Sequence, residues 1–165
     1  MSASTSTVEP ARLHRRRASH LYGLIISGSV LAAAPVEFGL GRVAAAVVLT
    51  LTVYWVAESY AHWIAARTVH GRDLTRDERR TVLADGLPLV ASCLVPVGVL
   101  VVEALLGMQT ATGVDIALAV NVVLLVGVGW RMGLAGGLRG VRLLMSAVVT
   151  GMLGAVMIAL KHGLH

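Results

Sequence analysis

The chain has 165 residues, of which 56% are hydrophobic and only 14% are charged. A soluble domain of this size usually has about a quarter charged residues and slightly under half apolar ones. Apolar runs of membrane-spanning length recur along the chain, which excludes a soluble enzyme, a disulfide-stapled secreted domain and a disordered tail. We therefore expect an integral, multi-pass protein of the cell (inner or plasma) membrane.

Basic residues outnumber acidic ones, 14 to 9. In a soluble protein this excess would suggest nucleic acid, but in a membrane chain it indicates topology, because Lys and Arg collect in cytoplasmic loops. We expect a lipid bilayer as the partner, with no nucleic acid and no cofactor. The single cysteine, Cys93, excludes an intrachain disulfide and a CxxC metal site, and we expect a small buried hydrophobe there.

The predicted fold class is all-α, a bundle of five transmembrane helices with a cytoplasmic N-terminus and the C-terminus outside. Residues 1–19 are polar and end in a basic cluster, which we interpret as a retained cytoplasmic segment. Residues 20–165 form one transmembrane domain. Its predicted spans cover about residues 21–36, 43–66, 87–107, 114–130 and 141–160, and each approaches the roughly 20 residues that cross a bilayer.

The distribution of arginines tests this count. With the N-terminus inside, three regions are cytoplasmic, namely residues 1–20, 67–86 and 131–142, and they hold 12 of the 14 basic residues. The outer side keeps only Arg42 and Lys161. This asymmetry is what the positive-inside rule requires, and it favours five spans over four.

A capping motif and two prolines predict helix ends between the second and fourth spans. Thr75 is followed three residues later by Glu78, the pattern of a capping box, which predicts a short cytoplasmic helix from about Arg76. We expect Pro88 to separate this helix from the third span. Pro96 lies in the middle of that span, where it breaks the hydrogen-bond ladder.

Ionisable residues within spans are the best functional signal, because a charge at a helix centre costs about 2.5–3.5 kcal/mol. In the second span Thr50, Tyr54, Glu58 and His62 recur every four residues and so share one helix face. A carboxylate and an imidazole one turn apart can share a proton or hold a divalent cation. Glu58 and His62 are the candidate metal ligands. In the alternative, Glu58 forms a hydrogen bond to a neighbouring helix and His62 lies at the membrane interface.

Tyr54, Glu58 and His62 are candidate ion or proton sites, and two further residues complete that list. Asn121 lies near the middle of the fourth span, where it either contacts a substrate or bonds across helices. Glu103 lies one turn from the end of the third span, where it either serves function or reaches the outer interface. Asp115, at the start of the fourth span, favours the helix dipole.

Small residues predict close helix packing in the fourth and fifth spans. They are Gly127, Gly129, Ser146, Thr150, Gly151 and Gly154. Such patterns serve contacts within one chain or a homodimer.

The sequence Val56-Ala57-Glu58-Ser59-Tyr60 resembles the small-residue–Glu–Tyr stretch late in the second span of the vacuolar iron transporter family. Five spans, a glycine-bearing first span from Leu21 and the run 137–142 before the fifth span are also similar to that family. This resemblance implies transport of a metal cation, with Glu58 as a candidate metal or proton site. The family's first span carries an Asp-Gly pair, whereas this chain has Ser27-Gly28. The stretch 54–57 also resembles short uncharacterised membrane proteins of actinobacteria.

We expect a small transporter of a cation, either a divalent metal or a cation coupled to protons. The alternatives are a non-transporting accessory or structural subunit of a membrane complex, and a small oligomeric channel. The chain has no Walker A, GxSxG or HExxH motif, and no nucleophile–base pair is visible, so we do not expect an enzyme.

Overall fold

The computed structural model describes residues 8–35, 37–70, 73 and 75–164, with side chains described for most residues from Ser19 onward. In this part of the chain the fold is all-α, as the sequence predicts, with six helices and no strand. The helices are α1 (Val8–Ala33), α2 (Leu40–His70), α3 (Arg76–Ala91), α4 (Leu94–Leu105), α5 (Thr110–Ala135) and α6 (Val141–Leu164). The side chains of Arg12, Arg15, Arg16 and Arg17 lie outside the described part, as do residues 1–7, Arg72 and His165.

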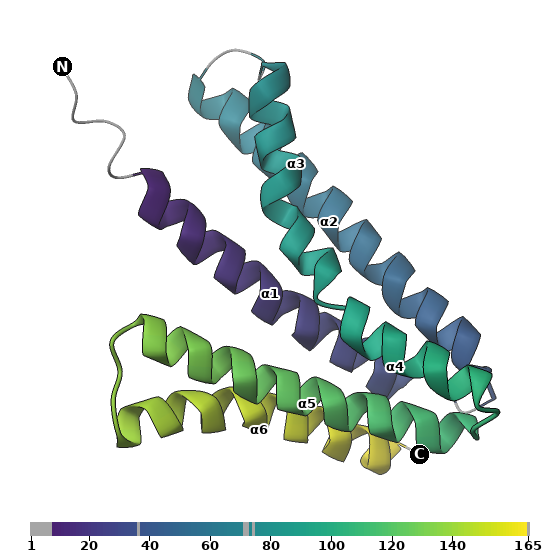
Figure 1. Cartoon of the computed structure of the whole chain (residues 1–165). Helices are drawn as coiled ribbons and strands as arrows, with labels where there is room; N and C mark the ends of the chain where they lie inside the picture. The colour runs from purple at the N-terminus through teal and green to yellow at the C-terminus, as the bar shows by residue number, and fades with distance from the viewer. Residues whose placement is uncertain (1–7, 36, 71–72, 74, 165) are drawn as a thin grey trace.

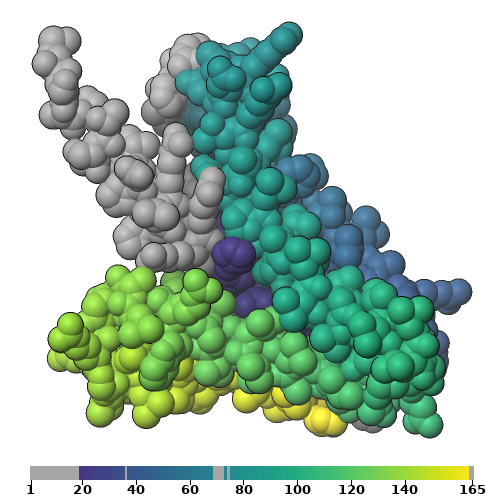
Figure 2. All heavy atoms as spheres, viewed as in Figure 1, coloured from purple at the N-terminus to yellow at the C-terminus, as the bar shows by residue number. Residues whose placement is uncertain are grey.

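Four of these six helices form two antiparallel pairs that diverge from a common end (Figure 1). One pair is α2 with α3, and the other is α5 with α6, which make the most extensive helix contact in the described chain. Helix α1 packs against members of both pairs, and α4 contacts α2 and α5. Figure 2 shows the α3 arm rising away from the block formed by α4, α5 and α6. The turns after α1 and α4 lie at the common end.

In the described part of the chain, three helical segments are long and apolar enough to cross a membrane: Leu40–Thr68, Thr110–Ala135 and Val141–Gly163. Helices α3 and α4 together also meet the test, but they are bent by 43° at their junction. The apolar part of α1, Ser19–Ala33, is shorter than these. Each of the five segments that the sequence predicts is therefore largely helical, and Pro35 follows the end of α1.

The start of α3 confirms the predicted capping box. The Thr75 backbone N–H donates to Glu78 Oε2 at 2.8 Å, and the Glu78 N–H donates to Thr75 Oγ1 at 3.3 Å. These two reciprocal bonds satisfy donors that a helix start otherwise leaves unpaired. Helix α3 accordingly begins at Arg76.

The third segment is interrupted one turn before Pro96 and not at Pro88. Pro88 is inside α3, and the helix continues to Ala91, so the prediction of a break at Pro88 was wrong. The chain instead leaves the helix at Ser92 and Cys93, and Pro96 sits in the first turn of α4. Because Pro96 has no N–H for the carbonyl four residues earlier, which is that of Ser92, the interruption falls one turn before the proline. Cys93 is buried there, as expected.

Helices α4 and α5 each end in a turn of the same type. After α4, the Gly107 N–H donates to the Ala104 carbonyl and the Met108 N–H donates to the Glu103 carbonyl. Gly107 has a φ of 68°, which favours glycine because it has no Cβ. Gly137 ends α5 in the same way. The turn after α4 fixes Glu103 in the last turn of that helix.

Most of the glycines and hydroxyl residues predicted to pack helices closely lie in the contact between α5 and α6 of the same chain. A Cβ on Gly129 would lie 2.9 Å from the Ser146 carbonyl oxygen, and a Cβ on Gly154 would lie 2.6 Å from a methyl of Val122. Ser146 Oγ donates to the Gly129 carbonyl at 3.0 Å. Gly127 is the exception, since it is exposed and a Cβ there would contact nothing.

Candidate functional site

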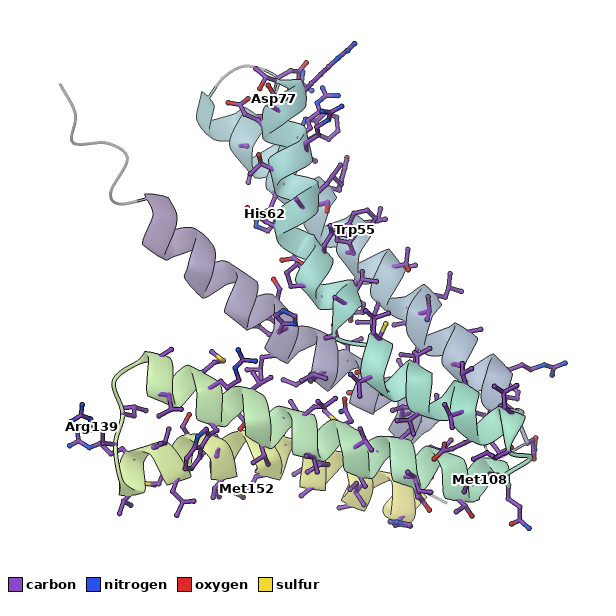
Figure 3. The ribbon with its side chains drawn as sticks, in the orientation of Figure 1. Trp55, His62, Asp77, Met108, Arg139 and Met152 are labelled. Carbon is purple, nitrogen blue, oxygen red and sulfur yellow. The ribbon has the colours of Figure 1, made fainter. Side chains whose placement is uncertain are left out.

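The contact between α2 and α3 holds the strongest sequence candidates. It is fixed by Trp55, whose indole Nε1–H donates to the Leu83 carbonyl at 3.1 Å. Gly86 lets the two helices approach, because a Cβ there would lie 2.7 Å from Trp55 Cδ1. In Figure 3 the Trp55 side chain lies on one side of α3, and that of His62 lies on the opposite side, toward α1.

A small crevice lies between these helices. It is lined by Glu58, Ser59 and His62 of α2 and by Val82, Asp85 and Gly86 of α3. Its volume is about 10 Å³. This volume is enough for one water molecule or one small ion and for nothing larger. The crevice therefore brings Glu58 and His62 together, as the sequence predicts.

The Glu58 carboxylate has an unpaired oxygen. Glu58 Oε2 is buried and has no hydrogen-bond partner. A carboxylate oxygen withdrawn from water normally accepts a hydrogen bond, because leaving it unpaired costs more than a typical hydrogen bond contributes. The unpaired oxygen therefore marks Glu58 as a place where a proton or a cation would be stabilised.

The tautomer of His62 follows from its geometry. His62 Nδ1 lies 2.7 Å from the Glu58 backbone carbonyl oxygen. Because a carbonyl can only accept, Nδ1 carries the proton when the ring is neutral. The other ring nitrogen, Nε2, is then the one able to accept a proton or bind a cation.

Asp85 was not among the sequence candidates. Asp85 nevertheless lines the crevice beside Glu58. Only the packing of α3 on α2 reveals this, because the two residues are far apart in the chain. Within the described residues, no group of three or more His, Cys, Asp or Glu side chains is arranged to hold a metal ion. The Glu58–His62 metal pair remains a prediction.

Tyr54 does not join this crevice. Its side chain is 51% exposed on the outer side of α2, although it is only one turn from Glu58. The polar stripe predicted on one face of the second span is therefore divided between a helix contact and the molecular surface.

Asn121 lies in the contact between α5 and α1, and it is only 1% exposed. Its Nδ2 donates to the Leu24 carbonyl at 2.9 Å, and its Oδ1 accepts from Ser27 Oγ at 3.3 Å. Ser27 Oγ is also 3.1 Å from the Leu24 carbonyl oxygen. The amide thus bonds across two helices, one of the two roles that the sequence allowed.

Glu103 is buried within the protein. It is only 5% exposed, and its Oε2 is buried with no hydrogen-bond partner. A Cβ on Gly113 would lie 2.9 Å from that oxygen and 2.7 Å from a methyl of Leu40. The turn after α4 folds α5 back over the glutamate, so its position near a helix end does not give it access to the surface.

Asp115 also has a partner that the sequence did not reveal. Lys161 Nζ donates to Asp115 Oδ1 at 2.6 Å, joining α6 to α5. Lys161 is buried, whereas the Asp115 side chain is about half exposed. The carboxylate therefore compensates a buried ammonium group in addition to any interaction with the helix dipole.

A separate hollow lies where α1 and α5 diverge. It has a volume of about 610 Å³ and is lined by His20 of α1 and by Val128, Arg131, Met132, Leu134 and Ala135 of α5. Its lining residues include the positively charged Arg131, which repels cations, and none of them is a carboxylate. The crevice at Glu58 is therefore the better candidate for a cation site.

Comparison of the chain with protein-family models, curated proteins and solved structures found no match.

Proposed function

We propose that this chain is a multi-pass integral membrane protein. Three helices have the length and apolarity to span a bilayer, and the bent pair α3–α4 supplies a fourth segment. Helix α6 carries large apolar side chains on its surface, more than a soluble protein normally leaves in contact with water. They include Val148, Val149, Met152, Val156 and Leu160. Lipid acyl chains would cover this face without cost.

The proposed orientation has the diverging ends of the helix pairs in the cytoplasm. Arginines gather at those ends of α2, α3, α5 and α6, whereas Arg42 and Lys161 belong to the common end. The positive-inside rule then directs the common end outward. In this orientation α1 supplies the first of the five spans, with its shorter apolar segment starting near Ser19.

We further propose that the protein is a small transporter of a cation, coupled to protons, with Glu58 as the binding carboxylate. The observation that carries this proposal is the buried, unpartnered Glu58 Oε2 within a helix of membrane-spanning length. Unpaired ionisable groups in such helices are expensive, and they generally mark ion or proton pathways. His62 and Asp85 in the same crevice supply the neighbouring proton acceptor and negative charge.

The proposed transport cycle requires helix movement. Val43, Val47 and Leu51 are fully buried or nearly so, and they separate Glu58 from the outer end of α2. A cation at Glu58 would therefore be released outward only after this apolar contact opens. The interruption at Ser92 and Cys93 is where α3 can move with respect to α4, because the helical hydrogen-bond ladder is already broken there.

The test is flux into proteoliposomes. Uptake of Fe²⁺ and Mn²⁺ would be measured together with internal pH, for the wild type, Glu58→Gln and the matched control Glu37→Gln, which alters an exposed residue in the turn after α1. We expect metal or proton flux in the wild type and in Glu37→Gln, and at least a tenfold loss in Glu58→Gln. Absence of flux in folded wild-type protein, or full flux in Glu58→Gln, would reject the transport proposal.

A second candidate, an accessory subunit or an oligomeric channel, is favoured by Tyr54. This residue lies in the middle of Leu40–Thr68 and is half exposed. A phenol hydroxyl facing acyl chains has no partner there, whereas a neighbouring helix from a second copy or another protein could pair with it. The oligomeric state of the reconstituted protein distinguishes the candidates, because a monomer with flux supports the carrier.

A further inference from the structure

A second cavity lies between α2 and α3, nearer the diverging ends than the Glu58 crevice. It has a volume of about 220 Å³ and is lined by Ser59, Tyr60, Trp63, Arg79, Val82 and Leu83. We call it the aromatic pocket. The two cavities share Ser59 and Val82, but Glu58 and Asp85 do not line the aromatic pocket.

The aromatic pocket contains a fixed cation. The Arg79 guanidinium carbon lies 5.4 Å from the centre of the Trp63 ring, within the range of a cation–π interaction. Tyr60 meets Trp63 edge to face, with ring centres 5.9 Å apart. These contacts hold the guanidinium over the indole but leave its N–H groups available, since a ring face does not replace an acceptor in the plane of the guanidinium.

Two polar atoms of the lining residues have no partner. Trp63 Nε1 and Ser59 Oγ are both buried, and neither has a hydrogen-bond partner. The indole N–H can only donate, and so can the guanidinium. A ligand that satisfies Trp63 and Arg79 together must therefore supply acceptor oxygens, and the positive charge of Arg79 favours an anion.

The remainder of the lining is apolar and opens to the surface. Val82 is partly buried, while Leu83 and Tyr60 are exposed. In the proposed orientation this opening lies at the cytoplasmic end of α2, at the depth where Trp and Tyr commonly meet lipid headgroups. A ligand here would have an anionic group against Arg79 and an apolar part along α2 and α3.

We propose that the aromatic pocket binds the phosphate of an anionic phospholipid headgroup, with Arg79, Trp63 and Ser59 as donors. This inference rests on the proposed membrane insertion and is independent of the proposed transport. The anionic lipid is favoured over a free anion because the donors adjoin exposed apolar side chains that a soluble anion would leave uncovered.

Lipid retention, measured by native mass spectrometry on the full chain, tests this site. Phosphatidylglycerol, phosphatidylcholine and inorganic phosphate would each be titrated into delipidated protein. We expect the wild type to retain phosphatidylglycerol about tenfold better than phosphatidylcholine and to show no saturable binding of phosphate alone. Saturable binding of phosphate alone would assign the pocket to a free anion. Equal retention of the two lipids, which both carry a phosphate, would show that the pocket does not select an anionic lipid. Either result overturns the proposal.

Three variants locate the site. Trp63→Phe keeps an aromatic ring but removes the N–H, and Arg79→Gln removes the charge. Arg80→Gln removes the same charge from the next residue, which is exposed and does not line the pocket. We expect about a tenfold loss of phosphatidylglycerol retention in the first two variants and less than a twofold change in the third. An equal loss in Arg80→Gln, or unchanged retention in Trp63→Phe, would overturn the proposal.

Failure of the lipid test and failure of the transport test are distinguishable. Trp63→Phe leaves the Glu58 crevice unaltered and Glu58→Gln leaves the aromatic pocket unaltered, because neither residue lines the other cavity. If Arg79→Gln fails to fold, as judged by circular dichroism, Trp63→Phe and Ser59→Ala still test the two uncharged donors.

Discussion

Two helix contacts in this protein bury polar side chains in opposite ways. In the contact of α1 with α5, the Asn121 amide and the Ser27 hydroxyl are paired with each other and with the Leu24 carbonyl. In the contact of α2 with α3, Glu58 Oε2, Ser59 Oγ and Trp63 Nε1 are buried without partners. Helices α1, α2 and α5 carry predicted spans, whereas the part of α3 that meets Glu58 lies in the predicted cytoplasmic region 67–86. Both contacts contain residues that the sequence selects.

The difference separates structural polar groups from functional ones. A buried amide whose donor and acceptor are both satisfied holds helices together, and it has no capacity left for a ligand. Buried atoms without partners lower stability unless a proton, an ion or a ligand pairs with them. We therefore expect substitutions in the α1–α5 contact to reduce stability, and substitutions in the α2–α3 contact to reduce ligand binding or transport.

The largest expected loss of stability comes from Gly28→Ala. A Cβ at this position would lie 2.5 Å from Asn121 Nδ2 and 2.6 Å from Met157 Sδ, so it would displace the amide from its partners. We expect the free energy of unfolding to fall by about 2–3 kcal/mol, measured by denaturant titration of tryptophan fluorescence in detergent. Gly127→Ala is the control, because a Cβ there contacts nothing. Equal stability of the two variants would show that the α1–α5 contact is looser than described.

A smaller loss is expected for Asn121→Ala. This substitution removes both bonds of the amide but leaves the Ser27 hydroxyl paired with the Leu24 carbonyl. Hydrogen bonds between membrane helices are typically worth under 2 kcal/mol, and we expect a loss of about 1–2 kcal/mol in the same titration. Flux in proteoliposomes should be retained by the folded fraction. Loss of flux without loss of stability would move Asn121 from the structural group to the functional one.

The smallest change in stability is expected for Glu58→Gln. The carboxylate oxygen Oε2 has no partner to lose, and the amide is similar in size and uncharged. The free energy of unfolding should stay within about 0.5 kcal/mol of the wild type or increase, even though transport is lost. A fall of about 2 kcal/mol or more would mean that the Glu58 carboxylate is part of a stabilising network, and the comparison between the two contacts would fail.

Much of the helical architecture was predictable from local patterns. The apolar runs predicted five helical segments, and the Thr75–Glu78 capping box placed the start of α3 at Arg76. The position of the break near Pro96 was not predictable to the residue, because a proline removes a hydrogen bond one turn before itself and neighbouring packing decides which helix end absorbs the bend. Pro88, with the same local signal, lies within a continuous helix.

The candidate site was predictable only in part. Four-residue spacing placed Tyr54, Glu58 and His62 on one side of α2, yet α3 covers Glu58 and His62 and leaves Tyr54 exposed. Asp85 joins the crevice from the other helix. Periodicity defines the face of a single helix, but the neighbour that covers the face, and how much of it, depends on how pairs of helices cross.

The sequence by itself determined that the chain is helical and apolar, because composition and periodicity act locally along the chain. It also determined that the arginines gather in alternate loops between the predicted spans. It also selected Glu58, Asn121 and Glu103 as unusual residues for their surroundings. Only the tertiary structure decided which of them are paired. Asn121 meets Ser27 and Leu24 across α1, whereas the buried carboxylates of Glu58 and Glu103 each keep an unpartnered oxygen. Hydrogen bonding depends on distances of about 3 Å between atoms of different helices, and helix packing fixes these distances.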